Sequence, residues 1–400
     1  MNVLTFTTLW PNAEKPGLGV FVKHRAMALA QRPTVANLRV VAPVPFFPKR
    51  LAFGFVPARW RQMAHIAERE NVGGLATWHP RFFNPPRVGM RWYGYWMASG
   101  AEPVVRQLHA QERFDLIDAH YVYPDGAAAV RLGEALGAPV CVTARGTDIN
   151  LFSQLPHIRR LIQRTLQRAQ GIIAVSAALK QRMVELGLEA DKITVIRNGI
   201  DRQTFHWRDQ AAARQRRGLN GADRILVTVG ALVPLKGLDR LIGAMQSVAH
   251  TESRARLFII GEGPERAALV AQISAAGLEQ HVFLTGTKPQ QELPDWYAAA
   301  DVFCLASERE GCPNVIIEAM ACGAPVVASA VGGIGELVAD ERFGLLVPEA
   351  EANASGFAMR VTAALARPWE REMIAAHASA RGWTEVAEEV LAYWHSRRLC

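Results

Sequence analysis

Two carboxylates stand eight positions apart in the segment Glu310-Gly-Cys-Pro-Asn-Val-Ile-Ile-Glu318, which follows the apolar run 302–306. Pro313 suits the first position of a helix, because it lacks an N–H that would find no partner there. The amides of Asn314 and Val315 would then face a ligand in front of the helix, an arrangement that favours phosphate. The segment therefore predicts an anion-binding turn between two acids.

The two acids flank this turn. Side chains on a helix lean toward its N-terminus, so Glu318 can reach back to hydroxyl groups beside a bound phosphate. Glu310, in the turn with Gly311, lies on the other side of that phosphate. A phosphate cradle between two hydroxyl-binding carboxylates is typical of a sugar-nucleotide site. The alternative is a structural pair at a helix end, with Glu318 a half-buried carboxylate that needs hydrogen-bond partners.

A cation suited to the same ligand follows an earlier strand. Lys236 comes after a predicted strand that ends on Gly230, and it precedes Gly237 at the start of a helical pattern. A lysine in this place can set its ammonium on a diphosphate as a point charge. The alternative is a solvated lysine beside a turn glycine.

Further candidates follow strands of the N-terminal half. His120 directly follows the predicted strand 115–119, where a strand delivers a side chain into a cleft, although a lone histidine is often structural. Asp148 follows the next strand and suits either a ligand or a loop cap. Gly17 and Gly19 lie between the first strand and a helix, where glycine lets backbone N–H groups approach a ligand or simply forms a turn.

Apolar runs alternate with helical patterns along the chain, which predicts parallel sheets with crossover helices. The first series comprises strands near 2–7, 38–44, 115–119, 139–143, 171–175 and 192–196, and helices near 20–31, 94–111, 125–136, 156–168 and 177–187. The second comprises strands near 224–230, 255–260, 281–285, 302–305, 325–328 and 344–347, and helices near 237–249, 263–276, 290–299, 314–322 and 353–366.

Two complete series in 400 residues predict an α/β protein of two Rossmann-like domains. We expect an N-terminal domain at 1–200, a C-terminal domain at 201–383, and a final helix within 384–400 that crosses back to the first domain. The join is expected near 198–223, where 207–217 is charged and poor in branched residues. Ligands of such sheets bind beyond the carboxyl ends of the strands, so the two domains are expected to face each other across a cleft.

The 310–318 segment resembles the donor signature of glycosyltransferase family 4, whose members are retaining enzymes of the two-domain GT-B fold. The resemblance extends in family order to 16–22, 115–120, 197–201, 230–237, 261–266 and 319–328. It implies that the C-terminal domain binds a nucleotide-sugar donor and the N-terminal domain binds the acceptor. It also implies that no cofactor or metal ion is required.

The resemblance assigns roles to the candidates. Glu318 would hold the ribose, Glu310 would contact the transferred sugar near its reacting carbon, and Lys236 would contact the donor phosphates. His120 would lie by the scissile bond, and the loop of Gly17 and Gly19 would lie on the acceptor side.

The chain departs from the family at two positions. Many relatives have histidine in place of Arg145, which suggests that Arg145 binds an anionic sugar or a phosphate. Many relatives also have arginine in place of Ala231, so the phosphate clamp lacks one cation unless Arg145, Arg197 or Arg309 supplies it.

The overall composition bears on the cellular location of the protein and on the kind of partner it binds. No apolar run approaches the ~20 residues of a membrane span, and the five cysteines show no disulfide or metal spacing. Residues 1–200 hold 25 Lys+Arg against 13 Asp+Glu, a net of +12, whereas residues 201–400 hold 20 against 24, a net of −4, which together give +8. We therefore expect a cytoplasmic protein whose N-terminal half faces an anionic partner.

Aromatic and basic residues interleave between 46 and 98, where 12 aromatic residues and 8 Lys+Arg accompany only 2 acids. This composition suits docking at the inner face of the cytoplasmic membrane better than binding of nucleic acid. An aromatic core with solvated arginines is the alternative.

The sequence thus predicts a retaining glycosyltransferase that moves a sugar from a nucleotide-diphosphate donor to an acceptor hydroxyl. The resemblance is strongest to members that build surface polysaccharides on polyprenyl-diphosphate carriers. A GT-B sugar-nucleotide 2-epimerase and an inactive sugar-nucleotide-binding scaffold are the alternatives. The sequence does not name the donor base, the sugar or the linkage.

Overall fold

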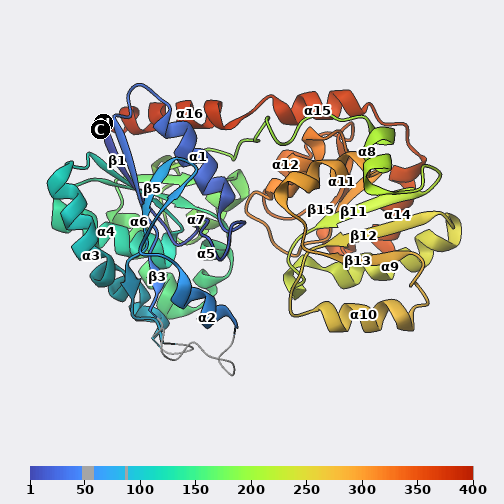
Figure 1. Ribbon diagram of the computed structural model, residues 1–400, viewed down its shortest axis with the longest axis horizontal. Coiled ribbons are helices and arrows are strands. Elements are labelled where there is room, and N and C mark those ends of the chain that lie inside the picture. The colour runs from blue at the N-terminus through green and yellow to red at the C-terminus, as the bar shows by residue number, and fades with distance from the viewer. Residues whose placement is uncertain (47–57, 86–88, 400) are drawn as a thin grey trace. The chain divides into compact units, whose positions relative to one another are not determined.

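The chain folds into two compact units. The computed structural model describes residues 1–46, 58–85 and 89–399. Unit 1 combines Met1–Gly199 with the residues from Trp383 onward, and unit 2 is Ile200–Gly382. Each unit contains a sheet with helices on both faces (Figure 1).

The sheet of unit 2 is wholly parallel and runs in the order β13-β12-β11-β14-β15-β16. Its strands are β11 (Arg224–Val229), β12 (Ala255–Ile260), β13 (Val282–Gly286), β14 (Val302–Leu305), β15 (Val326–Ser329) and β16 (Gly344–Val347). The chain winds outward from β11 to one edge and then from β14 to the other. The strand order therefore reverses between β11 and β14, which is where doubly wound sheets bind ligands.

Helices cover both faces of this sheet because its strands are apolar on both sides. Ile225 and Val227 of β11 pack into the core on one face, whereas Leu226 packs into the core on the other. The first face is covered by α8 (Gln210–Arg217), α11 (Leu293–Ala299), α12 (Asn314–Ala321), α13 (Ile334–Leu337) and α15 (Arg371–Ser379). The second face is covered by α9 (Leu238–Thr251), α10 (Arg266–Ala275) and α14 (Ala354–Ala366).

The larger sheet of unit 1 has the order β10-β9-β8-β7-β1-β2-β5-β4. Its strands are β1 (Asn2–Phe6), β2 (Asn37–Val41), β4 (Arg69–Val72), β5 (Leu75–Trp78), β7 (Leu116–His120), β8 (Val140–Ala144), β9 (Gly171–Ala174) and β10 (Ile193–Val195). Only β4 runs antiparallel to its neighbour among the described pairs, and a separate two-stranded sheet pairs β3 (Val44–Pro45) with β6 (Arg81–Phe82). The order reverses between β1 and β7.

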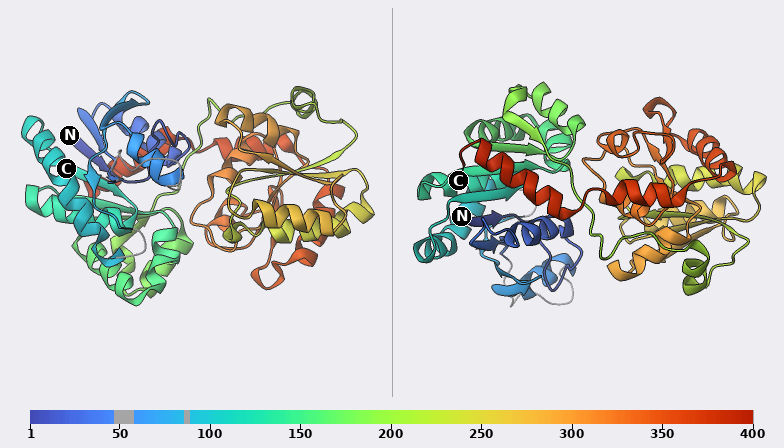
Figure 2. Two further views of the ribbon diagram at one scale, coloured as in Figure 1. Left: turned by 60° about the horizontal axis from the view of Figure 1, so that its bottom comes forward. Right: turned by 90° about the horizontal axis from the view of Figure 1, so that it is seen from above.

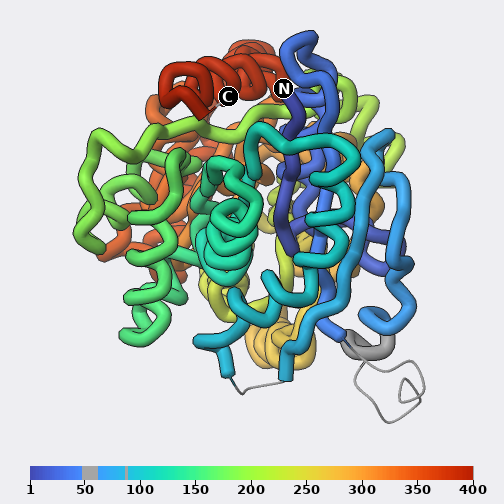
Figure 3. Tube along the Cα trace, turned by 90° about the vertical axis from the view of Figure 1, so that its left-hand side faces the viewer, coloured from blue at the N-terminus to red at the C-terminus, as the bar shows by residue number. Residues whose placement is uncertain are grey.

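The C-terminal helix α16 (Trp383–Ser396) returns to unit 1, where it lies beside α1 (Val20–Ala30) on one face of the sheet (Figure 2). Trp394 is fully buried there. On another part of the unit, α3 (Tyr93–Gln111) packs along α4 (Ala127–Leu136) (Figure 3). The remaining helices of unit 1 are α2 (Ala58–His65), α5 (Thr147–Asn150), α6 (Pro156–Arg168) and α7 (Ala177–Glu185).

The predicted α/β class is confirmed, but several elements were missed. The hairpin β4–β5 turns at Gly73 and Gly74, both of which have positive φ. The charged segment 207–217, within the expected join between the domains, contains α8. Asp209 caps this helix by accepting a hydrogen bond from the Ala212 amide, and its arginines pair with acids from elsewhere in unit 2.

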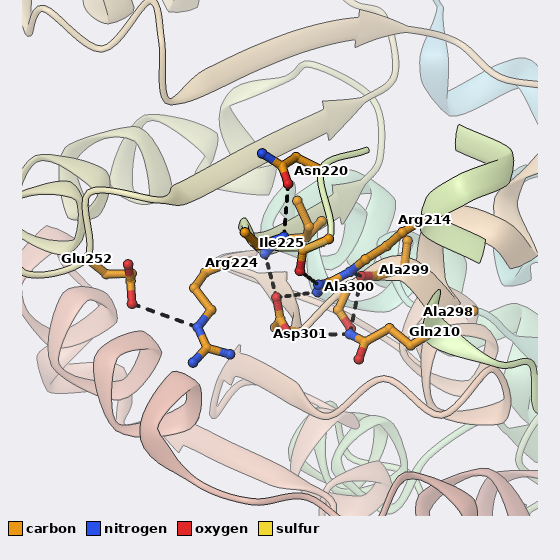
Figure 4. A network of polar contacts seen from close by, with 12 residues as sticks. Gln210, Arg214, Asn220, Arg224, Ile225, Glu252, Ala298, Ala299, Ala300 and Asp301 are labelled. Atoms are coloured by element: carbon orange, nitrogen blue, oxygen red, sulfur yellow. Dashed lines mark hydrogen bonds and ion pairs between the residues drawn. The ribbon is translucent and has the colours of Figure 1, made fainter. Parts of the chain in front are cut away.

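A largely buried ion pair holds α8 against the sheet (Figure 4). The Asp301 carboxylate accepts hydrogen bonds from the guanidinium of Arg214 and from the backbone amide of Ile225, both at 2.6 Å. Arg214 also donates to the carbonyls of Ala299 and Gly221. One carboxylate thus joins α8, the start of β11 and the segment before β14.

We expect Asp301→Ala to destabilise unit 2 by about 3 kcal/mol, because it leaves the buried Arg214 charge and the Ile225 amide without their acceptor. Urea denaturation of the full chain measures the loss. The control is Asp340→Ala, which removes an exposed pair with Arg342 and should cost less than about 1 kcal/mol. Equal losses for the two variants would show that the Asp301 network contributes no more than a surface pair.

Candidate functional site

Two loops meet at the carboxyl ends of β11 and β14 in unit 2. The loop after β11 carries Lys236 in a short 3-10 turn, and the loop after β14 carries Glu310. The Lys236 Nζ atom lies 2.6 Å from Glu310 Oε1, although the two residues are 74 positions apart. The side chains keep 23% and 13% of their surface exposed, so this ion pair remains within reach of solvent and of a ligand.

The backbone fixes the two loops together. The Glu308 amide donates to the Leu235 carbonyl at 2.9 Å. Gly237 has φ +58°, and a Cβ there would stand 2.2 Å from the carbonyl oxygen of Ala306. No larger residue fits, so the glycine that follows Lys236 lets the loops approach. The Lys236 side chain itself runs past Gly230, within 3.7 Å of where a Cβ would be.

The turn before α12 lies in the same loop as Glu310. The prediction for Pro313 was wrong by one position: it is the N-cap, with extended backbone, and Asn314 is the first helical residue. Its ring has no N–H to donate in either position, and the first amides of an α-helix have no acceptors within the helix. Gly311 and Pro313 are buried, whereas Asn314 and Val315 are half-buried in the first turn.

Glu318 lies one turn into α12 and is half-buried. Its Oε2 accepts a hydrogen bond from the hydroxyl of Tyr297, at 2.9 Å, and Tyr297 on α11 is fully buried. Burial, together with the charge of Asp201, raises the pKa of Glu318 to about 7 against the opposing effect of the Tyr297 hydrogen bond. The carboxylate is therefore held in place by one partner in an environment that disfavours its charge.

Candidates of unit 1 gather at the ends of β7 and β8. His120 is the last residue of β7 and is fully buried. Its Nδ1 lies 2.6 Å from a terminal nitrogen of Arg145, and its Nε2 lies 3.1 Å from Asp118 Oδ2. Both ring nitrogens are thus engaged by protein groups.

Arg145 follows β8 and is half-buried. Its other terminal nitrogen donates to Asn198 Oδ1 at 2.9 Å, and its guanidinium carbon lies 5.0 Å from the ring centre of Phe21. Three partners from separate segments, two polar and one aromatic, therefore set the plane of the guanidinium.

Asp148 makes the contacts of a loop cap. Its carboxylate accepts hydrogen bonds from the backbone amides of Val122, Arg145 and Gly146. Burial raises its pKa, against the effect of these amides. Asp148 thus shapes the loop that carries Arg145.

The two glycines after β1 differ. Gly19 has φ +62° at the start of α1, and a Cβ there would stand 2.1 Å from the Leu9 carbonyl oxygen. Gly17 is exposed, with nothing within 4 Å of a Cβ. Gly19 is therefore needed by the backbone, whereas the space at Gly17 is open.

The structure thus brings Gly230, Lys236, Glu310, Gly311, Pro313, Asn314 and Val315 to one edge of unit 2, with Glu318 a helical turn beyond, and His120, Arg145 and Asp148 to one edge of unit 1. Sequence reasoning missed Tyr297, and it missed Asp118 although Asp118 stands two residues before His120. Alternate residues of a strand share a face, so this spacing was a usable signal. Of the three arginines considered as replacements at Ala231, only Arg309 belongs to unit 2.

Within 1–46, 58–85 and 89–399, no three His, Cys, Asp or Glu side chains gather as they would around a metal ion. In the same ranges, no helix is both long and apolar enough to cross a bilayer.

Comparisons with known proteins agree with this arrangement. The family pattern described as Glycosyltransferase Family 4 matches residues 68–204, and the pattern described as Glycosyl transferases group 1 matches residues 209–381. A Bacillus subtilis protein assigned by its name to teichuronic acid biosynthesis, the glycosyltransferase TuaC, is 28% identical over 359 residues, which cover 87% of this chain and 86% of the relative.

A D-inositol 3-phosphate glycosyltransferase of Frankia alni is 31% identical over 326 residues, covering 75% of this chain and 79% of the relative. Among solved structures, Anabaena HepE in complex with UDP superimposes with a TM-score of 0.72 at 22% identity, over 99% of this chain and all of HepE. The chain therefore belongs to glycosyltransferase family 4 and is a glycosyltransferase of the GT-B fold.

Proposed function

We propose that the protein transfers a sugar, with retention of configuration, from a nucleotide-diphosphate sugar to an acceptor hydroxyl in surface polysaccharide synthesis. The observation that carries the proposal is the Lys236–Glu310 pair beside the start of α12, at the strand reversal of unit 2. The name of the TuaC relative supports the polysaccharide setting. We further propose a saccharide linked to polyprenyl diphosphate as the acceptor, with the protein at the cytoplasmic membrane face.

Lys236 and Glu310 suggest how donor binding proceeds. A diphosphate carries more negative charge than the Glu310 carboxylate, so it competes for the Lys236 ammonium as it enters. The released carboxylate of Glu310 then faces the sugar, where it stabilises positive charge at the reacting carbon. Lys236 and the first amides of α12 stabilise the departing diphosphate, so we propose no metal ion.

Arg145 suits an acceptor that carries an anion. Its two terminal nitrogens are directed by neutral partners, His120 and Asn198, and a guanidinium binds phosphate through paired N–H groups. The name of the Frankia alni relative includes D-inositol 3-phosphate, a phosphate-bearing molecule, which is consistent with an anion site on this side. A polyprenyl-diphosphate carrier has such a group next to its saccharide.

The first test is Lys236→Ala. A screen of UDP-, GDP- and ADP-sugars by thermal shift identifies the donor, because a ligand raises stability by mass action, and we would start with UDP. With that donor, the variant should lose about 1.5–3 kcal/mol of binding, which is roughly 10- to 100-fold in affinity. Sugar transfer, followed as nucleotide release with an acceptor, should fall at least as much.

The matched control is Arg240→Ala, which removes an ion pair between the first turn of α9 and Glu308, in the loop that carries Glu310. We expect it to leave donor affinity within about twofold, because exposed pairs contribute little. A Lys236→Ala variant with unchanged affinity and turnover would contradict the proposed phosphate contact.

Glu318→Gln should affect protein stability and donor binding in opposite directions. The pKa of Glu318 in the folded protein, about 7, lies above its ordinary value of 4.5, so the folded state binds the proton more tightly than the unfolded state. The contribution of Glu318 to the free energy of unfolding is therefore greatest below pH 4.5 and is lost as pH rises through 7. The glutamine variant should lack this loss and be more stable than the parent at pH 8, by at most about 3 kcal/mol.

Since Glu318 is half-buried, solvent reduces that difference. Urea denaturation at pH 5 and pH 8 measures it, with the exposed Glu341→Gln as control. If Glu318 holds the ribose, the same variant binds the donor about tenfold more weakly or worse. A variant that is less stable than the parent at pH 8 would contradict the pH argument.

An exposed aromatic–arginine surface on unit 1 supports membrane docking. It comprises Phe83, Trp92 and Tyr95, which are 48–58% exposed, with Arg91 and Arg131. Arg91 lies over the Trp92 ring and Arg131 lies over the Tyr95 ring. Interfacial aromatic rings and arginines are a combination suited to anionic lipid, and each cation contributes about 1 kcal/mol near such a surface.

The alternative interpretation, an aromatic core, applies to Phe82, which is buried in the core of unit 1. Phe47, Lys49, Arg50 and Arg87, which also prompted the membrane prediction, lie outside the described residues.

We expect the protein to sediment with vesicles of phosphatidylglycerol and phosphatidylcholine at low salt, and less with phosphatidylcholine alone. The double variant Trp92→Ser, Tyr95→Ser should bind the anionic vesicles several-fold more weakly, because both interfacial rings are lost. The control, Val270→Ser with Met359→Ser, removes hydrophobic side chains of unit 2 that are 50% and 55% exposed. No binding by the parent, or equal loss in the control, would contradict docking by this surface.

A further inference from the structure

Beneath Arg145, buried polar side chains of unit 1 form a connected row. Arg25 of α1 donates to Thr143 Oγ1 and to Asp118 Oδ1, each at 3.0 Å. Asp118 Oδ2 lies 3.1 Å from His120 Nε2, and His120 Nδ1 lies 2.6 Å from Arg145. Arg25, Asp118, Thr143 and His120 are each at most 3% exposed, so the row leads from the interior to the half-buried Arg145.

The row has one consistent arrangement of hydrogens. A guanidinium has donors only, so His120 Nδ1 must accept from Arg145. The proton of the neutral ring is then on Nε2, from which it is donated to the Asp118 carboxylate. Burial lowers the pKa of His120 to about 3, with Asp118 opposing and Arg145 adding to the effect, which agrees with a neutral ring.

The two carboxylate oxygens of Asp118 contact different partners. Oδ1 pairs with Arg25, which compensates the buried charge, and Oδ2 accepts from His120. Although burial alone would raise the pKa of Asp118, Arg25 and His120 lower it to about 2. A carboxylate that stays charged keeps accepting from Nε2–H and so selects one histidine tautomer.

We propose that Asp118 and Arg25 are positioning residues for the transfer reaction. They hold His120 in the Nε2–H tautomer, and the free lone pair on Nδ1 then directs the guanidinium of Arg145 toward the anionic group of the acceptor. The inference rests on the proposed function for the contact between Arg145 and the acceptor. The tautomer of His120 is independent of that function, because the hydrogen-bond geometry sets it.

A gain in folding stability does not by itself explain this row of buried polar side chains. Burying charged side chains costs solvation energy that their mutual attraction roughly repays, so well-packed apolar residues would stabilise the sheet about as well. A row that ends on a half-buried guanidinium is instead suited to fixing the direction of that group.

Asp118→Asn should break the arrangement without changing the size of the side chain. The amide oxygen has to accept from Arg25, which leaves the amide N–H₂ facing His120 Nε2–H, donor against donor. The ring relieves this clash by shifting its proton to Nδ1, and that N–H then faces the donors of Arg145. The contact between His120 and Arg145 is thereby lost.

A second substitution should restore it. In the double variant Arg25→Met, Asp118→Asn, no guanidinium competes for the amide oxygen. The amide can then turn its oxygen toward His120 Nε2–H, and Nδ1 again accepts from Arg145. Rescue by removal of a charged partner is expected from tautomer control and not from a general loss of packing.

Long-range ¹H–¹⁵N spectra of protein labelled with ¹⁵N-histidine report the tautomer directly, with His120 assigned from His120→Gln. We expect an Nε2-protonated ring in the parent, a changed ring signal in Asp118→Asn, and the parental signal in the double variant. A parental tautomer in Asp118→Asn would overturn the proposal whether or not the protein is active.

Kinetics test the consequence, with the donor found by thermal shift and a synthetic polyprenyl-diphosphate-linked monosaccharide as acceptor. Asp118→Asn should raise the KM for the acceptor or lower kcat by about 10- to 100-fold in total, the size of one charge-assisted contact, and the double variant should recover most of it. Donor-induced stabilisation, which reports on unit 2, should stay as in the parent. Unchanged acceptor kinetics alongside a changed tautomer would also overturn the proposal.

Thr143→Val is the matched control, because it removes a buried hydrogen bond to Arg25 without touching His120. Thr143→Val should be destabilised about as much as Asp118→Asn. It should nevertheless keep the parental tautomer of His120 and the parental acceptor kinetics. If Thr143→Val lowers turnover as much as Asp118→Asn does, the row is structural. Lack of donor binding or transfer by the parent would instead refute the proposed function, and the spectra would still decide the tautomer.

Discussion

The ion pair between Lys236 and Glu310 is the interaction on which the site of unit 2 depends. Neither residue would hold a fixed place alone, since each lies in a loop after a strand. The reversal of strand order sets β11 and β14 side by side, and the backbone contact between Glu308 and Leu235 joins their loops. Because both side chains retain some exposure, the pair is weak enough for a more highly charged ligand to separate it.

Both units contain a doubly wound sheet, but their charged side chains differ in burial. In unit 2, the polar groups at the sheet edge remain partly exposed, as a charged ligand requires. In unit 1, Arg25, Asp118 and His120 are buried beneath Arg145 and compensate one another. A buried network of this kind has few alternative arrangements, because each donor and acceptor must be satisfied. The row therefore acts as a rigid support.

Much of the fold follows from local pattern in the sequence. Apolar runs of four to six residues, separated by helical patterns, predicted every strand of the unit 2 sheet, because strands covered on both faces are apolar throughout. The missed elements lacked that signal. Strand β4 is largely polar, β5 has only four residues, and α8 is rich in arginine, so none of them shows a sustained apolar period. The helix forms because Asp295 and Asp301, about eighty positions later, pair with its arginines.

The sequence by itself determined the two α/β series, the family, and the segments that reach the carboxyl edges of the sheets, because strand ends, glycine turns and helix starts are local properties of the chain. Only the tertiary structure decided the partners. Glu310 with Lys236 joins residues 74 positions apart, and Asp118 with Arg25 joins residues 93 apart. Which ring nitrogen of His120 bears the proton depends on those partners too. Hydrogen-bond direction and burial are properties of atoms brought together from distant segments, and no local pattern encodes them.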